Sequence, residues 1–238
     1  MKRFGGKHVA VTGAARGIGL AIAQRLADEG ARLTLLDRDD AVRDVLPGAT
    51  SHVVDISDRE AVLAAFTEPL DGLVANAGIG GANLPGDGDR FDEILRTNLY
   101  GTYWCARAAE PLLADGGRIV VTSSILSRIG VAKYTGYCAS KAGLLGLVRA
   151  LAAELAPRRI QVNAICPGWV DTDMTRLGLS LFEGLTEDEA WEVAKQEVPL
   201  RRMSEPAEIA GTVAWLLSDD SVGVTGQAID QNNGAFMI

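Results

Sequence analysis

Short β-branched or leucine-rich runs alternate with longer helix-like patterns along almost the whole chain, and this alternation limits the folds that it can adopt. In the first expected helix, Gly17–Glu29, the apolar residues Ile18, Ile22 and Leu26 lie four apart and share one face. Alternating strands and helices are typical of a parallel sheet covered on both faces. We therefore predict a doubly wound α/β fold. The expected strands are His8–Val11, Arg32–Leu36, His52–Val54, Gly72–Ala75, Arg118–Thr122, Ile160–Ile165 and Ala228–Ile229, and the other expected helices are Asp58–Phe66, Phe91–Leu113, Tyr137–Leu155 and Ala207–Leu217.

The length and composition predict one domain. The chain has 238 residues, 47% of them apolar, which is enough to bury one sizeable core. No linker-like stretch divides it, so we expect a single domain over residues 1–238. Residues 171–199 combine many acidic residues with apolar ones such as Leu177 and Phe182, which predicts an insertion of one or two short helices. This insertion either packs on the body of the domain or covers a substrate as a lid.

Charge and composition argue against several classes of protein. The net charge is −8 and no dense Lys/Arg cluster is present, which argues against binding to nucleic acid. No apolar run approaches the roughly 20 residues of a membrane-spanning helix. Cys105, Cys138 and Cys166 are odd in number and far apart, which favours a reducing, cytoplasmic location over a disulfide framework. No Cys/His cluster has metal-ligand spacing, so we expect no metal site.

A glycine-rich turn, Thr12–Gly19, follows the first expected strand and opens the first expected helix. Its glycines allow a tight turn and let the backbone approach a pyrophosphate, while the helix N-terminus offers free N–H groups to the anion. A plain tight turn has similar glycines, but the strand–turn–helix context favours a dinucleotide site. The residues expected to bind the cofactor here are Gly13, Arg16, Gly17, Ile18 and Gly19.

Asp37, at the end of the second expected strand, bears on the choice of cofactor. A carboxylate there accepts hydrogen bonds from ribose hydroxyls and repels a 2′-phosphate. Arg16 and Arg38 favour the opposite choice, because either side chain can pair with a phosphate, and Asp37 can also be a solvated acid of a turn. We predict NAD(H) as the preferred cofactor, with NADP(H) left open.

Further polar and small residues follow the third and fourth expected strands. Asp55 and Ile56 are placed to meet the adenine, and Asn76, Ala77 and Gly78 to let the backbone approach the cofactor ribose. Ligands of open α/β sheets bind at the carboxyl ends of strands, which is where all these residues lie.

Tyr137 and Lys141 are four residues apart on one expected helix and therefore share a face. An ammonium group near a phenol favours the phenolate, so we expect Lys141 to lower the pKa of Tyr137 and make it a proton donor and acceptor. Ser124 ends the fifth expected strand, where its hydroxyl can hold a substrate oxygen. Asn98 is a polar residue inside an apolar helical pattern, where it can hold a water that connects Lys141 to solvent.

Taken together, these motifs resemble the short-chain dehydrogenase/reductase family in its single-domain form. The matching residues are Thr12-Gly13-x-x-x-Gly17-Ile18-Gly19, Asp55, Asn76-Ala77-Gly78, Asn98, Ser124, Tyr137-x-x-x-Lys141 and Pro167-Gly168. The resemblance implies a Rossmann-like, mostly parallel sheet of seven strands. It also implies that Tyr137 is the general acid/base, that Lys141 holds the nicotinamide ribose, that Ser124 polarises the carbonyl group and that Asn98 belongs to a proton relay.

The resemblance extends to the second half of the chain. It implies that Pro167 and Gly168 flank the nicotinamide and that Val170 and Thr172 contact its carboxamide. Residues 171–199 correspond to the variable substrate loop of the family, which favours the lid. The family also implies a homotetramer or homodimer, with contacts through the helices that hold Asn98 and Tyr137 and through the apolar C-terminal region.

The expected substrate pocket is mostly apolar or aromatic, which favours a neutral, fairly hydrophobic secondary alcohol or ketone oxidised or reduced with NAD(H). A polyol or sugar stays open, because Asn83 can serve hydroxyl groups. One alternative is an NADPH-dependent reductase of a 3-oxoacyl thioester of carrier protein or CoA, with Arg128 and Arg176 as a basic patch for an acidic carrier. Another is a non-catalytic dinucleotide sensor. The residues expected in the pocket are Ser124, Ile125, Leu126, Tyr134, Trp169, Met174, Leu177 and Phe182.

Overall fold

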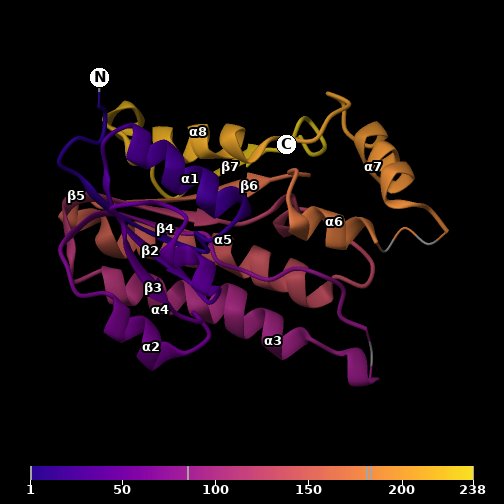
Figure 1. Cartoon of the computed structure of the whole chain (residues 1–238), viewed down its shortest axis with the longest axis horizontal. Helices are drawn as coiled ribbons and strands as arrows, with labels where there is room; N and C mark the ends of the chain where they lie inside the picture. The colour runs from indigo at the N-terminus through magenta and orange to yellow at the C-terminus, as the bar shows by residue number, and fades with distance from the viewer. Residues whose placement is uncertain (1, 85, 181, 183, 238) are drawn as a thin grey trace.

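The computed structural model describes residues 2–84, 86–180, 182 and 184–237, and the strands of these residues form one sheet (Figure 1). The strand order is β3-β2-β1-β4-β5-β6-β7, and every neighbouring pair is parallel. The predicted doubly wound, seven-stranded parallel sheet is thus confirmed. The strands are β1 (His8–Thr12), β2 (Arg32–Asp37), β3 (Thr50–Val53), β4 (Leu70–Ala75), β5 (Leu113–Thr122), β6 (Gln161–Pro167) and β7 (Ala228–Gln231).

Helices cover both faces of the sheet. One face packs against α1 and α8, and the opposite face packs against α2, α4 and α5 (Figure 1). Every residue of β1 and of β6 is buried, because these strands have a helical layer on both sides. The helices are α1 (Gly17–Asp28), α2 (Arg59–Ala65), α3 (Phe91–Leu95), α4 (Thr102–Ala109), α5 (Thr135–Leu155), α6 (Asp173–Leu179), α7 (Glu187–Gln196) and α8 (Pro206–Leu217).

The helix predicted over Phe91–Leu113 is divided. After α3 the backbone forms a wide π-helical turn over Arg96–Gly101, and α4 ends at Ala109. Leu113 already belongs to β5, which begins five residues earlier than predicted. The prediction was wrong there because apolar periodicity does not distinguish an α-turn from a π-turn, nor a helix end from the start of a buried strand.

Residues 171–199 hold α6 and α7. Leu179, Ala190 and Ala194 from these helices form a small apolar cluster together with Met203, and Phe182 packs against it. This cluster is separate from the two larger ones that line the sheet. In the part of the chain that the structure describes, no helix combines the length and the apolar character needed to cross a membrane.

Candidate active site

The predicted site residues lie at the carboxyl edge of the sheet, next to the point where the strand order reverses between β1 and β4. The hydroxyl oxygen of Thr12, at the end of β1, accepts hydrogen bonds from the N–H groups of Asn76 and Ala77, each at 3.1 Å. The amide of Asn76 donates to the carbonyl oxygens of Thr12 and Gly13, both at 3.2 Å. These bonds hold the glycine-rich turn and the end of β4 as one unit. Thr12 was not predicted as a site residue, although its position just before Gly13 could have indicated it.

The glycine-rich turn is closely packed. A Cβ atom on Gly13, whose φ is +69°, would lie 2.7 Å from the Cα of Ala77, and one on Gly19 would lie 1.9 Å from the carbonyl oxygen of Gly13. The N-cap residue of α1, Arg16, makes no side-chain capping bond. The N-terminus of α1 is therefore open to an anionic group, so this turn fits a dinucleotide pyrophosphate.

Two carboxylates, those of Asp37 and Asp39, lie at the end of β2. Asp37 accepts hydrogen bonds from the N–H groups of Ala15, at 2.9 Å, and of Asp39, at 3.0 Å, so it is not a freely solvated turn residue. Arg16, which the sequence left open as a phosphate ligand, forms an ion pair with Asp39. Arg38 is exposed. Asp37 and Asp39 thus place negative charge at this edge, while the positive charge of Arg16 is already paired.

Two other predicted cofactor residues have local structural roles. Asp55 is exposed, and its carboxylate accepts a hydrogen bond from the N–H of Ser57 at 2.8 Å. Ile56 is buried against Gly101, where an added Cβ would lie 2.8 Å from the Ile56 side chain. The side chain of Ile56 therefore belongs to the core.

Tyr137, Lys141 and Ser124 come together between α5 and the end of β5. The Nζ of Lys141 lies 5.6 Å from the centroid of the Tyr137 ring and donates a hydrogen bond to the carbonyl oxygen of Thr122 at 2.8 Å. Ser124 is buried and hydrogen-bonded to Tyr137. A Cβ on Gly78 would lie 3.5 Å from the Lys141 Nζ, so the loop after β4 closes the site on this side. The arrangement is suited to binding a carbonyl oxygen and passing a proton to it.

Asn98 lies in the π-helical turn and is fully buried. Its Oδ1 accepts a hydrogen bond from the N–H of Ile79 at 2.8 Å, and its Nδ2 donates to the Ile79 carbonyl oxygen at 2.9 Å and to the Ser140 hydroxyl at 3.1 Å. The side chain thus fixes the loop after β4 against α5. This role was not predicted from the sequence, because Ile79 and Asn98 meet only in the folded chain.

The structure reverses the expected direction of the Tyr137 pKa. Burial raises the pKa of Tyr137 to about 12, although the hydrogen bond with Ser124 acts in the opposite direction. Burial lowers the pKa of Lys141 to about 8. Desolvation of the phenolate outweighs the ammonium group, which faces the ring from 5.6 Å rather than contacting the hydroxyl group.

The raised pKa of Tyr137 predicts how kcat depends on pH in the two directions of the reaction. A protonated phenol can give its proton to a carbonyl oxygen at neutral pH, whereas oxidation of an alcohol requires the phenolate. We expect the kcat for oxidation to rise between pH 7 and 9, by up to about tenfold for each pH unit, and the kcat for reduction to change little there. Steady-state kinetics in both directions across this range measure the effect. An oxidation rate that falls from pH 7 to 9 would contradict it.

Several predicted substrate residues surround Tyr137. The ring of Tyr134 packs edge-on against the Tyr137 ring, with 6.3 Å between centroids. A Cβ on Gly80 would lie 3.1 Å from the Met174 side chain and 3.8 Å from the Tyr137 ring, so α6 and the loop after β4 meet beside the phenol. A Cβ on Gly178 would lie 3.5 Å from the Tyr134 hydroxyl. The lining of this side is thus largely apolar.

Gly80, Met174 and Tyr134 form a wall beside Tyr137, and the remaining predicted substrate residues lie at different distances from it. Trp169 flanks Gly178, at 3.6 Å from the position of an added Cβ, and Leu177 flanks Gly81 at 4.0 Å. Leu126 donates its N–H to the Ser124 hydroxyl at 3.2 Å, and Ile125 is buried. Phe182 packs in the α6–α7 cluster described above, so its expected place in the pocket has no contact to support it.

The segment after β6 leads from the sheet to α6. A Cβ on Gly168, just after Pro167, would lie 2.9 Å from Asn232, so only a glycine fits there. Val170 is buried and its carbonyl oxygen accepts a hydrogen bond from the Thr175 hydroxyl. Thr172 caps α6, and its methyl group lies 3.4 Å from the position of an added Cβ on Gly17. Thr172 therefore reaches the glycine-rich turn.

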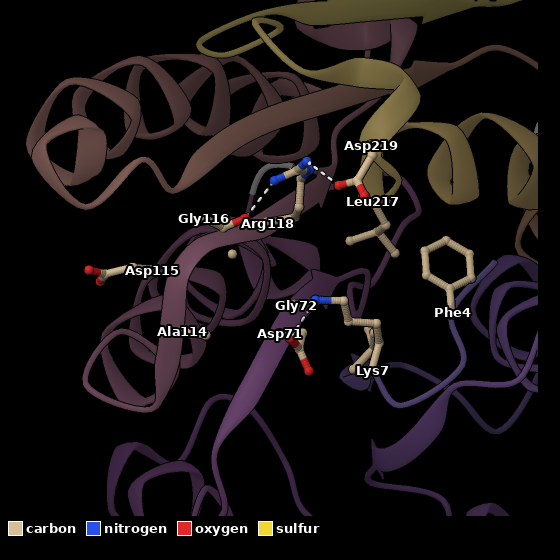
Figure 2. A pocket seen from close by; sticks show the side chains of 12 residues that line it. Phe4, Lys7, Asp71, Gly72, Ala114, Asp115, Gly116, Arg118, Leu217 and Asp219 are labelled. Carbon is tan, nitrogen blue, oxygen red and sulfur yellow. Dashed lines mark hydrogen bonds and ion pairs between the residues drawn. The ribbon is translucent and has the colours of Figure 1, made fainter.

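A small cavity lies at the opposite, amino edge of the sheet, among residues of β1, β4 and β5 and of the segments beside them (Figure 2). Its volume is only about 50 Å³. Figure 2 shows Lys7 directed toward Asp71, at 3.0 Å, and Arg118 toward Asp219, at 3.2 Å. Because these charges are paired and the volume suits only a water or two, the cavity is not an active site. No group of His, Cys, Asp or Glu able to hold a metal ion occurs among the residues that the structure describes.

Comparison with known proteins agrees with this geometry. The family model described as enoyl-(acyl carrier protein) reductase matches residues 13–235. The 3-oxoacyl-[acyl-carrier-protein] reductase MabA of Mycobacterium tuberculosis is 34% identical, covering 98% of this chain and 94% of its own. FabG of Staphylococcus aureus, named for the same reaction, is 36% identical over 97% of this chain and 98% of its own.

Solved structures give the same result for the fold. Levodione reductase has a TM-score of 0.90 at 33% identity and covers 98% of both chains. The aldohexose dehydrogenase of Thermoplasma acidophilum has a TM-score of 0.89 at 29% identity, covering 98% of this chain and 94% of its own. The match extends over nearly the whole length, and Ser124, Tyr137 and Lys141 converge as the sequence predicted; the chain therefore belongs to the short-chain dehydrogenase/reductase family of nicotinamide-dependent oxidoreductases.

Proposed function

We propose that this chain interconverts a 3-oxoacyl thioester and the corresponding 3-hydroxyacyl thioester. The observation that carries the chemistry is the placement of Tyr137 beside Ser124 and Lys141 at the carboxyl edge of the sheet. The similarity to MabA and FabG over almost the whole chain favours the thioester, which was the alternative in the sequence analysis, over a simple ketone.

In the proposed reduction, Ser124 and Tyr137 hold the substrate carbonyl oxygen between their hydroxyl groups. A bound reduced nicotinamide would supply the hydride to the carbonyl carbon. Tyr137 gives its phenolic proton to the carbonyl oxygen, and the carbonyl becomes a secondary alcohol. Lys141, whose pKa is lowered to about 8, can exchange a proton near neutral pH and stabilises the phenolate that remains.

The carrier of the acyl group is a separate question from the reaction. Arg128 is paired with Asp230 at 3.2 Å, and Arg176 is paired with Asp171 at 3.0 Å and with Glu187 at 2.6 Å. Neither arginine therefore offers an unpaired charge to an acidic carrier protein. A soluble CoA thioester is the appropriate first probe.

The test compares acetoacetyl-CoA with cyclohexanone as substrates. Each reaction is measured by the consumption of NADH and, in a separate assay, of NADPH. We expect a higher kcat/KM for acetoacetyl-CoA. A higher value for cyclohexanone would instead favour the second candidate, a neutral ketone or secondary alcohol, which the apolar contacts of Met174 and Tyr134 beside Tyr137 support. Binding of NADH without turnover of any carbonyl compound in a wider panel would favour the dinucleotide sensor.

We also propose that NAD(H) is preferred over NADP(H), because Asp37 and Asp39 put negative charge at the end of β2, where a 2′-phosphate would have to bind, and Asp39 neutralises Arg16. The expected result is tighter binding of NADH than NADPH by the native protein. Asp37→Ala should shift the ratio of the two dissociation constants toward NADPH by about tenfold, equivalent to about 1.4 kcal/mol. Fluorescence titration measures both constants. Asp40→Ala, in the same acidic run, is the matched control, and an unchanged ratio in Asp37→Ala would contradict the proposal.

The exposed apolar surface formed by the π-helical turn, α4 and α5 is proposed to bind a second copy of the chain. Tyr100 and Tyr103 are 52% and 40% exposed and border a shallow cavity of about 470 Å³ that is also lined by Leu99, Trp104 and Leu147. Such apolar surfaces mark subunit contacts, and a two-fold pair can cover the same patch on both copies. Replacing both tyrosines by Ser is expected to halve the mass measured by sedimentation velocity. Val222→Ser, at a residue 72% exposed elsewhere, should leave the mass unchanged. A monomeric native protein would contradict the proposal.

A further inference from the structure

The catalytic helix α5 begins without a cap of its own. Its N-cap residue, Tyr134, makes no side-chain capping bond, although the first N–H groups of a helix need partners. Tyr137 lies in this first turn. The position of the proposed acid/base therefore depends on what holds the first turn in place.

Asn83, in the loop after β4, supplies the missing partner. Its Oδ1 accepts hydrogen bonds from the N–H of Gly136 at 2.8 Å and from the hydroxyl of Thr135 at 3.0 Å. Its own N–H donates to the carbonyl oxygen of Lys133 at 2.8 Å. Asn83 thus caps α5 from a segment more than 50 residues earlier in the chain, instead of presenting its amide to substrate hydroxyl groups as the sequence suggested.

The nitrogen of the Asn83 side-chain amide is also hydrogen-bonded. Its Nδ2 donates to the carboxylate of Asp89 at 3.3 Å, and the same carboxylate oxygen accepts from the N–H of Phe91, at the start of α3, at 2.9 Å. A Cβ on Gly136 would lie 3.2 Å from the Cα of Phe91 and 3.4 Å from the Asn83 Oδ1. The start of α3, the loop and the start of α5 are therefore in close contact at Asn83.

The same loop forms a wall of the site. Gly80, three residues before Asn83, lies beside the Tyr137 ring, where an added Cβ would be 3.8 Å from it, and beside Met174 at 3.1 Å. Asn83 therefore connects two parts that must keep a fixed separation: the turn that carries Tyr137 and the wall that faces it.

We propose that Asn83 is a positioning residue: by capping the first turn of α5 from the β4–α3 loop, it holds the Tyr137 hydroxyl group toward Ser124 and sets the wall at Gly80. The inference rests on the proposed role of Tyr137. It does not depend on whether the substrate is a thioester or a ketone.

The test has one readout that needs no substrate and one that does. In Asn83→Ala, the ¹³C resonance of the Tyr137 ring, assigned with the Tyr137→Phe variant, should move, and kcat for the best substrate of the panel should fall by about tenfold or more, within the range that positioned acid–base groups contribute. The dissociation constant of NADH should stay within about twofold, because the hydrogen bonds of Asn83 go to Asp89 and to the start of α5 and not to the glycine-rich turn. The control is Asp58→Ala, which removes a carboxylate that caps two N–H groups of α2 at 3.0 and 3.1 Å; it should lower the melting temperature but leave the Tyr137 resonance and kcat unchanged.

A reversal of polarity provides the rescue. Combining Asn83→Asp with Asp89→Ser keeps an acceptor for the Gly136 N–H, and the serine hydroxyl can donate to the new carboxylate while its oxygen accepts from the N–H of Phe91. We expect this double variant to regain most of the kcat and the native Tyr137 resonance. An Asn83→Ala variant with unchanged Tyr137 resonance and unchanged kcat would overturn the inference. A moved resonance in a protein that reduces no carbonyl compound would overturn the proposed function but leave the positioning role standing.

Discussion

Replacing Tyr137 by Phe is expected to abolish turnover while leaving cofactor binding intact. The phenylalanine ring can keep the edge-on contact with Tyr134, at 6.3 Å between centroids, and the place beside the Lys141 ammonium, at 5.6 Å. Only the proton donor is lost. The kcat should fall by about 10²- to 10⁴-fold, the usual contribution of a positioned general acid. Steady-state kinetics give kcat, and fluorescence titration gives the dissociation constant of NADH.

Tyr134→Phe is the matched control, because it also removes one phenolic hydroxyl group. Tyr134 lies three residues before Tyr137, and its hydroxyl is near Gly178. We expect Tyr134→Phe to change KM more than kcat, because the phenylalanine ring keeps the edge-on contact with Tyr137 and only a hydroxyl group of the proposed substrate wall is lost. If Tyr137→Phe retained more than a tenth of the native kcat, the assignment of Tyr137 as acid/base would be wrong.

The second large effect concerns Gly19. In Gly19→Ala the new Cβ would lie 1.9 Å from the carbonyl oxygen of Gly13 and 2.6 Å from the Asn76 amide, so the turn and the end of β4 must separate. We expect a loss of about 3 kcal/mol or more in the free energy of unfolding. For a chain of this size that corresponds to a melting temperature lower by about 6–12 °C. Binding of NADH should be lost as well, because the same turn is the expected site of the cofactor pyrophosphate.

Gly146→Ala is the control for this experiment, since Gly146 lies inside α5 and a Cβ there would have no atom within 4 Å. It should raise the stability by about 0.5–1 kcal/mol, because alanine is the better helix former. Calorimetry in the presence and absence of NADH measures both quantities. An unchanged melting temperature and unchanged NADH binding in Gly19→Ala would show that the turn is looser than its contacts indicate.

The doubly wound parallel sheet and the place of the site could be predicted because their signals are local in sequence. Each strand is a short apolar run, the glycines of Thr12–Gly19 follow the first strand directly, and Tyr137 and Lys141 are one helical turn apart. The carboxyl ends of parallel strands meet at one edge, so separate motifs in the chain indicate one site. The same argument explains why Ser124 was found from its position after a strand.

The features that were missed depend on contacts between distant segments. The cap that Asn83 provides to α5, and the clamp between Asn98 and Ile79, join residues whose meeting no spacing rule indicates. The pKa of Tyr137 was predicted in the wrong direction because i,i+4 spacing shows that Lys141 is near but does not show how far the phenol is desolvated.

The π-helical turn at Arg96–Gly101 has a consequence for insertions and deletions. A π-turn contains one residue more than an α-turn, so deleting one residue within it would leave a regular helix from α3 into α4. Each residue of an α-helix advances the side chains by about 100°, so this shorter helix would rotate either Asn98 or the apolar face of α4 out of place. A continuous helix could not direct Asn98 to Ile79 beside the site and also pack the apolar face of α4 on the sheet. The extra residue allows both contacts. Among homologous chains, the length of this segment should therefore vary less than that of the neighbouring loops.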